Sequence, residues 1–508
     1  MRSISWLSLI QPINNMIFGT RHDDVLSALA DGDIVYGLRG DDLLSSNFNR
    51  TALIGGAGND TLSTDITAGV RNSGTTNGVA VQAGGTGDDT MQVNLNLTGF
   101  DVTSDIVACG GSGDDQIDVV AIADRFSLGN SFLTNTVDGG GGDDHITAYG
   151  ITPFAGLLGT VQNILTGGCG NDVLEATAIA QTNNPQLAFN SLDGGAGNDV
   201  LRAICSTDSN VRSPVGINEL SGGNGHDVLE ALQITDGENF TTDVTNNLEG
   251  GNGNDILTAD STALAQFQVF ATNFLQGGNG NDVLTARLTA GVSAAVPGLL
   301  EFNVSNVVTG GNGNDHLEAY AEATFGSVFV EELPRVENHL EGGNGVDVLL
   351  ATIAEGTAGS SFLNGGAGDD QLTVIGGSGN TLNGGDGRDW LVGGVGDEQL
   401  TGGRDADTFH FDVSVNQGTD TILDFEIRRD ILSFSGLIDQ GTPGLVDDLD
   451  AISNITDFGA GNDVVAEFDS GTHIVFSGLG IGNIDTWSEM VLHPATQLVA
   501  SGSSFALV

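Results

Sequence analysis

The stretch Gly250-Gly251-Asn252-Gly253-Asn254-Asp255-Ile256-Leu257 shows how this chain folds. It joins a tight, glycine-rich loop to one aspartate and then to an apolar pair at which a strand begins. Glycine adopts positive φ angles without strain and lets two backbones approach closely. A loop of this composition therefore predicts a sharp turn that exposes backbone carbonyl oxygens beside a carboxylate.

The same pattern, G-G-x-G-x-D-x-U-x with U a large apolar residue, recurs along most of the chain. Its copies begin at Gly55, Gly84, Gly110, Gly139, Gly167, Gly194, Gly222, Gly250, Gly277, Gly310, Gly342 and Gly365. Two degenerate copies precede them, at Gly19 and Gly37. A motif repeated at regular intervals is typical of a solenoid, which grows by adding coils.

This pattern resembles the RTX, or hemolysin-type, calcium-binding nonapeptide repeat of secreted bacterial proteins. The resemblance implies an all-β fold: a right-handed parallel β-roll or β-helix solenoid with calcium-binding loops along one edge and a C-terminal β cap. It also implies several bound Ca²⁺ ions. Carbonyl and carboxylate oxygens are the ligands that Ca²⁺ prefers, and one loop alone offers too few of them, so adjacent loops must share an ion.

The spacing of the copies predicts four regions. Residues 1–54 form an N-terminal cap with degenerate repeats. Residues 55–364 form a solenoid of wide coils of about 28 residues, with the motif on one edge only. Residues 365–411 form a short-period β-roll, with starts at Gly376, Gly384, Gly393 and Gly402, and residues 412–508 form a C-terminal cap. By resemblance, this last region also carries a type I secretion signal.

Within each wide coil, residues after the motif alternate between apolar and polar, the signature of a strand. Leu174, Ala176, Ala178 and Ala180 are expected to face inward. On the return strand, an asparagine stands four residues before the glycine pair and is expected to face inward too. Stacked coils would then align these asparagines in a buried ladder; they are Asn135, Asn163, Asn190, Asn218, Asn246, Asn273, Asn306 and Asn338. An outward asparagine array that binds sugar or ice is the alternative.

By the match to the motif, the calcium ligands are the aspartates at its sixth position. They are Asp24, Asp42, Asp60, Asp89, Asp115, Asp144, Asp172, Asp199, Asp227, Asp255, Asp282, Asp315, Asp347, Asp370, Asp389 and Asp407. The alternative is that they only cap turns, which a fixed offset from glycines in so many copies disfavours. Thr381 and Glu398 stand where aspartate is expected, so calcium sites there should be lost or weakened.

The composition excludes several classes of protein. The formal net charge is −53, and all 14 basic residues are arginine. Such a chain repels nucleic acid. No apolar run is long enough for a transmembrane segment, and residues 1–17 do not have the pattern of a Sec signal peptide. The three cysteines form neither a disulfide framework nor a zinc motif.

No catalytic motif is found: H-E-x-x-H, G-x-S-x-G and Walker A patterns are all missing. Histidines at and beside the loops are expected to be loop residues. Phenylalanines at the edge opposite the motif, such as Phe132, Phe189, Phe302 and Phe325, are expected to pack a small core, with an exposed aromatic row as the alternative.

These observations predict a secreted, extracellular protein that folds on binding calcium and has a structural or adhesive role. Its expected partners are calcium ions, cell-surface or matrix polysaccharide and the type I secretion machinery. The alternative is an extracellular enzyme, epimerase- or lyase-like, that acts on polysaccharide along the solenoid surface. A cluster of mixed acids, arginine and aromatic residues at one level of the stack would favour that alternative.

Overall fold

The structure is a computed structural model. It describes residues 9–69, 74–123, 129–155, 158–182, 186–208, 214–235, 241–295, 301–328, 335–427, 429–436, 453–459, 461–480, 484, 486–487, 499–501 and 504–507. These residues form strands β1 to β39. The chain divides into two compact units. Unit 1 comprises residues 1–275, 289–302 and 325–330, and unit 2 comprises residues 276–288, 303–324 and 331–508.

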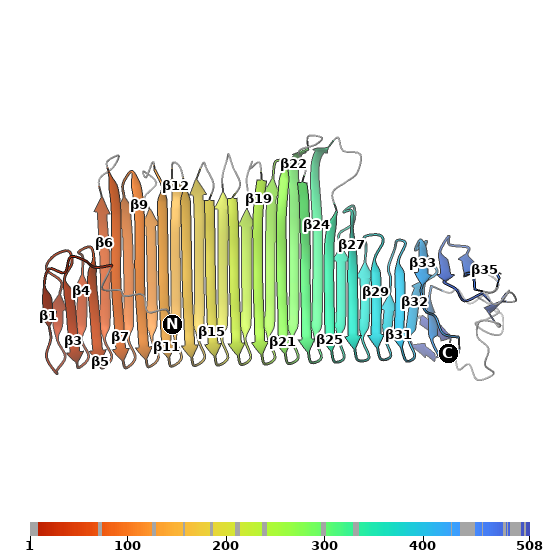
Figure 1. Cartoon of the computed structure of the whole chain (residues 1–508), viewed down its shortest axis with the longest axis horizontal. Helices are drawn as coiled ribbons and strands as arrows, with labels where there is room; N and C mark the ends of the chain where they lie inside the picture. The colour runs from red at the N-terminus through yellow and green to blue at the C-terminus, as the bar shows by residue number, and fades with distance from the viewer. Residues whose placement is uncertain are drawn as a thin grey trace. The chain divides into compact units, whose positions relative to one another are not determined.

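Unit 1 is built from two parallel sheets whose strands alternate along the chain (Figure 1). One sheet holds the odd-numbered strands, β1 (Met16–Phe18), β3 (Ile34–Arg39), β5 (Thr51–Ala57), β7 (Thr75–Thr86), β9 (Asp101–Ser112), β11 (Ser131–Gly141), β13 (Gly159–Cys169), β15 (Gln186–Ala196), β17 (Pro214–Asn224) and β19 (Thr241–Asn252). The other holds β2 (Val25–Ser27), β4 (Leu43–Ser46), β6 (Thr61–Gly69), β8 (Thr90–Thr98), β10 (Gln116–Ala123), β12 (His145–Ala155), β14 (Val173–Thr182), β16 (Val200–Asp208), β18 (Val228–Thr235) and β20 (Ile256–Ala265). Parts of β21 (Gln268–Asn279), β22 (Val283–Ala295), β23 (Glu301–Asn312) and β24 (His316–Val328) belong to each unit.

In unit 2, successive strands also alternate between two sheets, and they are shorter. They are β25 (Val336–Asn344), β26 (Val348–Ile353), β27 (Gly359–Ala367), β28 (Gln371–Ile375), β29 (Thr381–Asp386), β30 (Trp390–Val392), β31 (Gln399–Arg404), β32 (Thr408–Asp412), β33 (Thr419–Ile422) and β34 (Ile431–Ser435). Among the described residues of unit 2, antiparallel pairing involves β34 and the strands that follow it, which are β35 (Ser453–Asp457), β36 (Val464–Phe468), β37 (His473–Phe476), β38 (Val499–Ser501) and β39 (Ser504–Leu507). The all-β parallel β-roll expected from the sequence is therefore confirmed. The four-region division stays a prediction.

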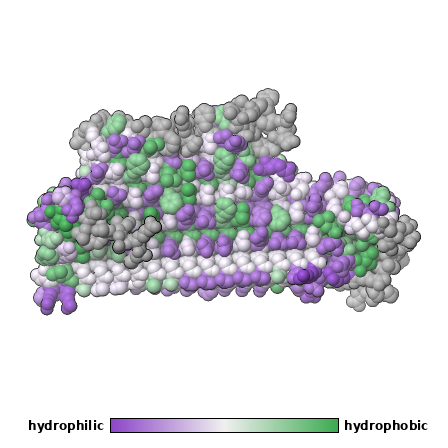
Figure 2. Space-filling model, viewed as in Figure 1, coloured by the Kyte–Doolittle hydropathy of each residue, from purple (hydrophilic) through white to green (hydrophobic). Residues whose placement is uncertain are grey.

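Equivalent residues of successive coils lie side by side. Leu174 on β14 pairs with Ile146 on β12 and with Leu201 on β16, and all three are fully buried. The small inward residues that follow Leu174, ending at Ala180, are buried as predicted. Within each unit, this alignment produces rows of side chains of one kind along the stacking direction, visible as bands in Figure 2.

The asparagines of the return strands form the buried ladder that the sequence predicts. In unit 1, Nδ2 of Asn163 donates to Oδ1 of Asn190 at 2.8 Å, and Nδ2 of Asn190 donates to Oδ1 of Asn218 at 2.9 Å. In unit 2, Nδ2 of Asn306 donates to Oδ1 of Asn338 at 2.9 Å. Buried amides need partners, and here each coil supplies them to the next.

The predicted phenylalanine core at the opposite edge is wrong for Phe132, which is 41% exposed. Its neighbour Leu133 takes the inward position of β11, so strict alternation turns Phe132 outward. Phe302 and Phe325 contact each other at a ring-centroid distance of 5.5 Å. Among the described residues, none of the elements is a helix of the length and apolarity needed to cross a membrane.

Candidate calcium-binding edge

The glycines of the loop are required by close contacts with the preceding coil. Gly251 and Gly253 have φ angles of 109° and 136°. A Cβ atom on Gly253 would lie 1.5 Å from the carbonyl oxygen of Gly225, and one on Gly251 would lie 2.2 Å from that of Gly223. Only glycine satisfies both the positive φ and this contact, so the loops stack backbone on backbone.

The sixth-position aspartates lie in a column at this edge in each unit. Each backbone N–H donates to Oδ1 of the equivalent aspartate one coil later, as from Asp115 to Asp144 and from Asp144 to Asp172, both at 2.8 Å. In unit 1 the column contains Asp24, Asp42, Asp60, Asp89, Asp115, Asp144, Asp172, Asp199, Asp227 and Asp255. In unit 2 it contains Asp282, Asp315, Asp347, Asp370, Asp389 and Asp407. All sixteen residues singled out from the sequence are thus brought together within their own unit.

The second carboxylate oxygen of these aspartates is the informative atom. A Cβ atom on Gly139 would lie 2.3 Å from Oδ2 of Asp144 and 2.9 Å from the carbonyl oxygen of Gly167, so this oxygen faces the glycine backbone. Oδ2 is buried and accepts no hydrogen bond in Asp42, Asp60, Asp89, Asp115, Asp144, Asp172, Asp199, Asp227, Asp315, Asp347, Asp370 and Asp389. A buried, unpaired carboxylate oxygen is costly unless a cation compensates it. These residues therefore fit Ca²⁺, a cation that takes oxygen ligands only.

Burial raises the pKa of these aspartates, although the backbone N–H bond lowers it in part; nearby carboxylates raise it further. The pKa rises to about 7 in Asp89, Asp144, Asp199, Asp347, Asp389 and Asp407. It rises to about 6 in Asp60, Asp115, Asp227 and Asp370. Without a cation, ionisation of these carboxyl groups in the folded column is therefore unfavourable near neutral pH.

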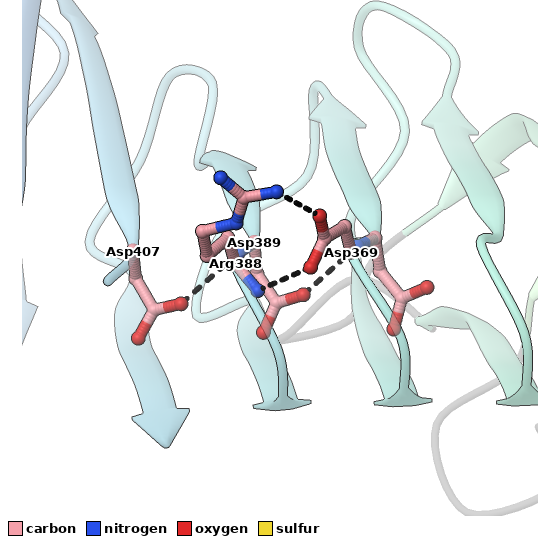
Figure 3. A network of polar contacts seen from close by, with 5 residues as sticks. Asp369, Arg388, Asp389 and Asp407 are labelled. Atoms are coloured by element: carbon pink, nitrogen blue, oxygen red, sulfur yellow. Dashed lines mark hydrogen bonds and ion pairs between the residues drawn. The ribbon is translucent and has the colours of Figure 1, made fainter. Parts of the chain in front are cut away.

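A second, exposed column runs beside the first, at the residue before each aspartate. The backbone N–H of Asp143 donates to Oδ1 of Asp114 at 2.8 Å, and that of Asn171 donates to Oδ1 of Asp143 at 2.7 Å. In unit 2, the guanidinium of Arg388 pairs with Oδ2 of Asp369 at 2.7 Å, while its backbone N–H donates to Oδ1 (Figure 3). This exposed column connects adjacent loops through hydrogen bonds and ion pairs. The sequence analysis did not predict it.

Two residues extend or qualify the predicted set. Asp24 differs from the buried members, because its Oδ2 accepts from the backbone N–H of Thr20 at 2.5 Å and from the Thr20 hydroxyl at 2.9 Å. Asp430, which was not among the predicted ligands, adds a step to the column in unit 2. Its Oδ1 accepts from the backbone N–H of Asp407 at 3.2 Å. The sequence Asp430-Ile431-Leu432 preserves the D-x-U part of the motif and is the signal that could have identified it.

On the opposite edge of the short coils in unit 2, the structure differs from the register predicted for the motif copy that begins at Gly376. Asn380, not Thr381, takes the place of the aspartate: it is fully buried, and its Oδ1 accepts from the backbone N–H of Ser361 at 2.8 Å. Its Nδ2 donates to Oε1 of Glu398 at 2.9 Å, and the backbone N–H of Glu398 donates to Oδ1 of Asp420 at 3.2 Å. Burial, with the contact to Glu398, raises the pKa of Asp420 to about 9. This edge thus has an asparagine and a glutamate at two of the positions that hold aspartates on the first edge, and an aspartate at the third.

Within the described ranges, no group of three or more histidine, cysteine, aspartate or glutamate side chains is placed to hold a metal ion. Each loop offers one carboxylate and its own backbone oxygens. An ion between two loops would therefore depend mainly on backbone oxygens, which the glycines leave accessible.

The fold and this edge define a calcium-binding repeat protein of the parallel β-roll class. The family model of the RTX calcium-binding nonapeptide repeat matches residues 13–45, 52–66, 133–150, 189–203, 240–262, 271–287, 304–322, 351–374 and 375–409. The chain is an RTX-repeat protein. Among curated proteins, a search finds no match.

Proposed function

We propose that this chain is exported unfolded, folds outside the cell when calcium binds along the aspartate edge, and then serves a structural or adhesive role. The observation that carries the proposal is the set of buried aspartates in the column, such as Asp144 and Asp172, whose Oδ2 atoms have no hydrogen-bond partner. Ca²⁺ bound there supplies the positive charge that the column lacks. The carboxylate Oδ2 atoms and the glycine carbonyl oxygens would hold several ions, each shared by two adjacent loops.

The expected calcium affinity indicates in which compartment the chain folds. Extracellular calcium modules bind at about 10⁻⁴–10⁻³ M, far above cytosolic Ca²⁺ levels. Because a preformed site does not exist in the unfolded chain, the free energy of binding becomes free energy of folding. With a net charge of −53, the chain would stay expanded in the cytosol. This state suits a type I secretion machinery that recognises the C-terminal region. Outside the cell, Ca²⁺ could also bridge its acidic surface to acidic matrix polysaccharide.

The test is a calcium titration followed by far-UV circular dichroism and by calorimetry. In EGTA at pH 7.5 we expect a largely disordered spectrum, and at millimolar Ca²⁺ a β spectrum with several ions bound per chain. A chain that is fully folded in EGTA would contradict the proposal.

A second candidate is an enzyme acting on extracellular polysaccharide, and one observation favours it. On the outer face of unit 2, Arg287, Glu318 and Tyr320 line one groove, and Nε2 of His316 lies 3.1 Å from Oε1 of Glu318. This is a mixed cluster of acid, base and aromatic residues on strands of adjacent coils. Release of reducing ends from a set of polysaccharides by the calcium-loaded chain would support it, and inactivity towards all of them would contradict it.

A further inference from the structure

A groove lies on the outer face of unit 2, across neighbouring strands. It encloses about 270 Å³, and its lining includes Thr285 and Arg287 of β22, Glu318 and Tyr320 of β24, and Leu350 and Thr352 of β26. Glu318 pairs with Leu350, and Tyr320 with Thr352, across neighbouring strands. The groove therefore crosses three consecutive coils.

The side chains of the groove are held by polar contacts outside it. Oε1 of Glu318 lies 3.1 Å from Nε2 of His316, and the Tyr320 hydroxyl donates to Oε2 of Glu322 at 3.1 Å. These contacts lie along β24, so they fix both side chains on a rigid strand. A site built on strands is positioned more accurately than one built on loops.

The chemistry of the lining points to a ligand with hydroxyl groups and an apolar face. Arg287 supplies donors only, the Glu318 carboxylate supplies acceptors only, and two threonine hydroxyls can do either. The Tyr320 ring and Leu350 supply apolar contact. Alternate residues of a strand lie about 6.6 Å apart and neighbouring strands about 4.8 Å apart, so these groups surround a space of the size of a small ring.

The charge of the chain selects among such ligands. Arg287 is one of 14 basic residues against 67 acidic ones, and the groove is lined by one positive charge, on Arg287, and one negative charge, on Glu318. The groove itself offers no excess positive charge, and the net charge of −53 repels anions. Nucleotides, phosphates and acidic sugars are therefore disfavoured.

We propose that this groove binds an uncharged sugar unit of a glycan. Arg287 donates to its hydroxyl oxygens, Glu318 accepts from its hydroxyl groups, and Tyr320 and Leu350 pack against its C–H face. The inference rests on the proposed function in one respect, because the groove exists only in the calcium-folded chain.

The experiment uses the full chain in 5 mM Ca²⁺, with circular dichroism recorded first to verify folding. The probes are cellohexaose, maltohexaose and mannohexaose, with hexagalacturonate as the charged comparator, measured by saturation-transfer NMR and calorimetry. We expect at least one neutral hexasaccharide to bind at least tenfold more tightly than hexagalacturonate. Arg287→Gln and Glu318→Gln should each weaken that binding about tenfold, as for the loss of one hydrogen bond to a charged group.

The matched control is Arg202→Gln. Arg202 is also an outward arginine on a strand, but it lies in unit 1 between Glu175 and Glu230, at 3.3 and 2.8 Å. Its replacement should leave sugar binding unchanged. A chain that folds with calcium yet binds none of the neutral probes, that prefers hexagalacturonate, or that binds equally well after Arg287→Gln would overturn the inference and leave the calcium function standing. A chain that does not fold with calcium would contradict both.

Discussion

The backbone N–H of Asp115 donates to Oδ1 of Asp144, which lies 29 residues later in the chain, at 2.8 Å. The same carboxylate turns its other oxygen, Oδ2, towards glycine backbone, where it accepts no hydrogen bond. Asp144 thus performs two tasks with two oxygens. Oδ1 ties one coil to the next, and Oδ2 is available to a cation.

Because the two oxygens have separate roles, Asp144→Asn is a selective test of the calcium edge. The amide keeps an oxygen for the Asp115 N–H but removes the negative charge. We expect a higher Ca²⁺ concentration at the folding midpoint and a loss of roughly 1–3 kcal/mol of stability in saturating calcium, measured by denaturation with urea. The control is Asp143→Asn in the same loop. This exposed residue also accepts a backbone N–H across coils, and its replacement should have little effect. Equal effects of the two variants would argue against a calcium role for Oδ2.

The raised pKa values predict an unusual pH dependence in the absence of calcium. The ordinary pKa of an aspartate side chain is 3.8, and in the folded column the pKa rises to about 7 for residues such as Asp89 and Asp389. The folded state therefore binds more protons than the unfolded state between about pH 4 and 7, so stability falls as pH rises through this window. Stability is highest below the unfolded pKa and is lost above the folded pKa.

We therefore expect calcium-free chain to show more β signal by circular dichroism at pH 5 than at pH 8. Saturating Ca²⁺ should remove most of the difference, and calcium binding near pH 6.5 should release protons, detectable by calorimetry in buffers of different ionisation enthalpy. A β signal that decreases from pH 8 to pH 5 without calcium would show that the column is not the dominant titrating group.

Features that repeat could be predicted from the sequence, and features that occur once could not. The aspartate column and the asparagine ladder recur at fixed offsets from the glycines, so period-two alternation assigns a face to residues such as Asn190. The register of the loop before Leu382 is mispredicted because the pair Gly376-Gly377 aligns with the start of the motif. The D-x-U spacing instead places Asn380 at the aspartate position.

The Glu398–Asp420 contact and the groove at Arg287 are formed by residues that do not repeat. They depend on which of these residues become neighbours when successive coils stack. Arg287 and Tyr320 are 33 residues apart, and the coil lengths in this region vary with the turn at the far edge. Adjacency of such residues follows from the register of the stack, which no local pattern reveals.

The asparagine ladder should stabilise the stack at its interior. Asn190 is fully buried; its Nδ2 donates to Oδ1 of Asn218 and to the carbonyl oxygen of Ile204, both at 2.9 Å. Asn190→Ala leaves the Nδ2 group of Asn163 without its acceptor, so we expect a loss of about 1–3 kcal/mol and a lower midpoint of thermal unfolding in saturating Ca²⁺. The control is Asn224→Ala, at an exposed position where Asn224 accepts from Asn252. It should cost less than about 0.5 kcal/mol. A larger loss in the exposed variant would refute a special role for the buried ladder.

Two adjacent glycines of one loop provide the sharpest test of backbone stacking. Gly142 has a φ angle of 128°, and a Cβ atom there would lie 2.1 Å from the carbonyl oxygen of Gly113 in the preceding coil. Gly141, the residue before it, has no atom within 4 Å of the equivalent position. We expect Gly142→Ala to cost several kcal/mol, more than the roughly 1–3 kcal/mol typical of backbone strain alone, because the coils must also separate. Gly141→Ala should be close to neutral. Calcium titrations of both variants, monitored by circular dichroism, measure the difference, and similar folding midpoints for the two would show that the loops are not stacked as described.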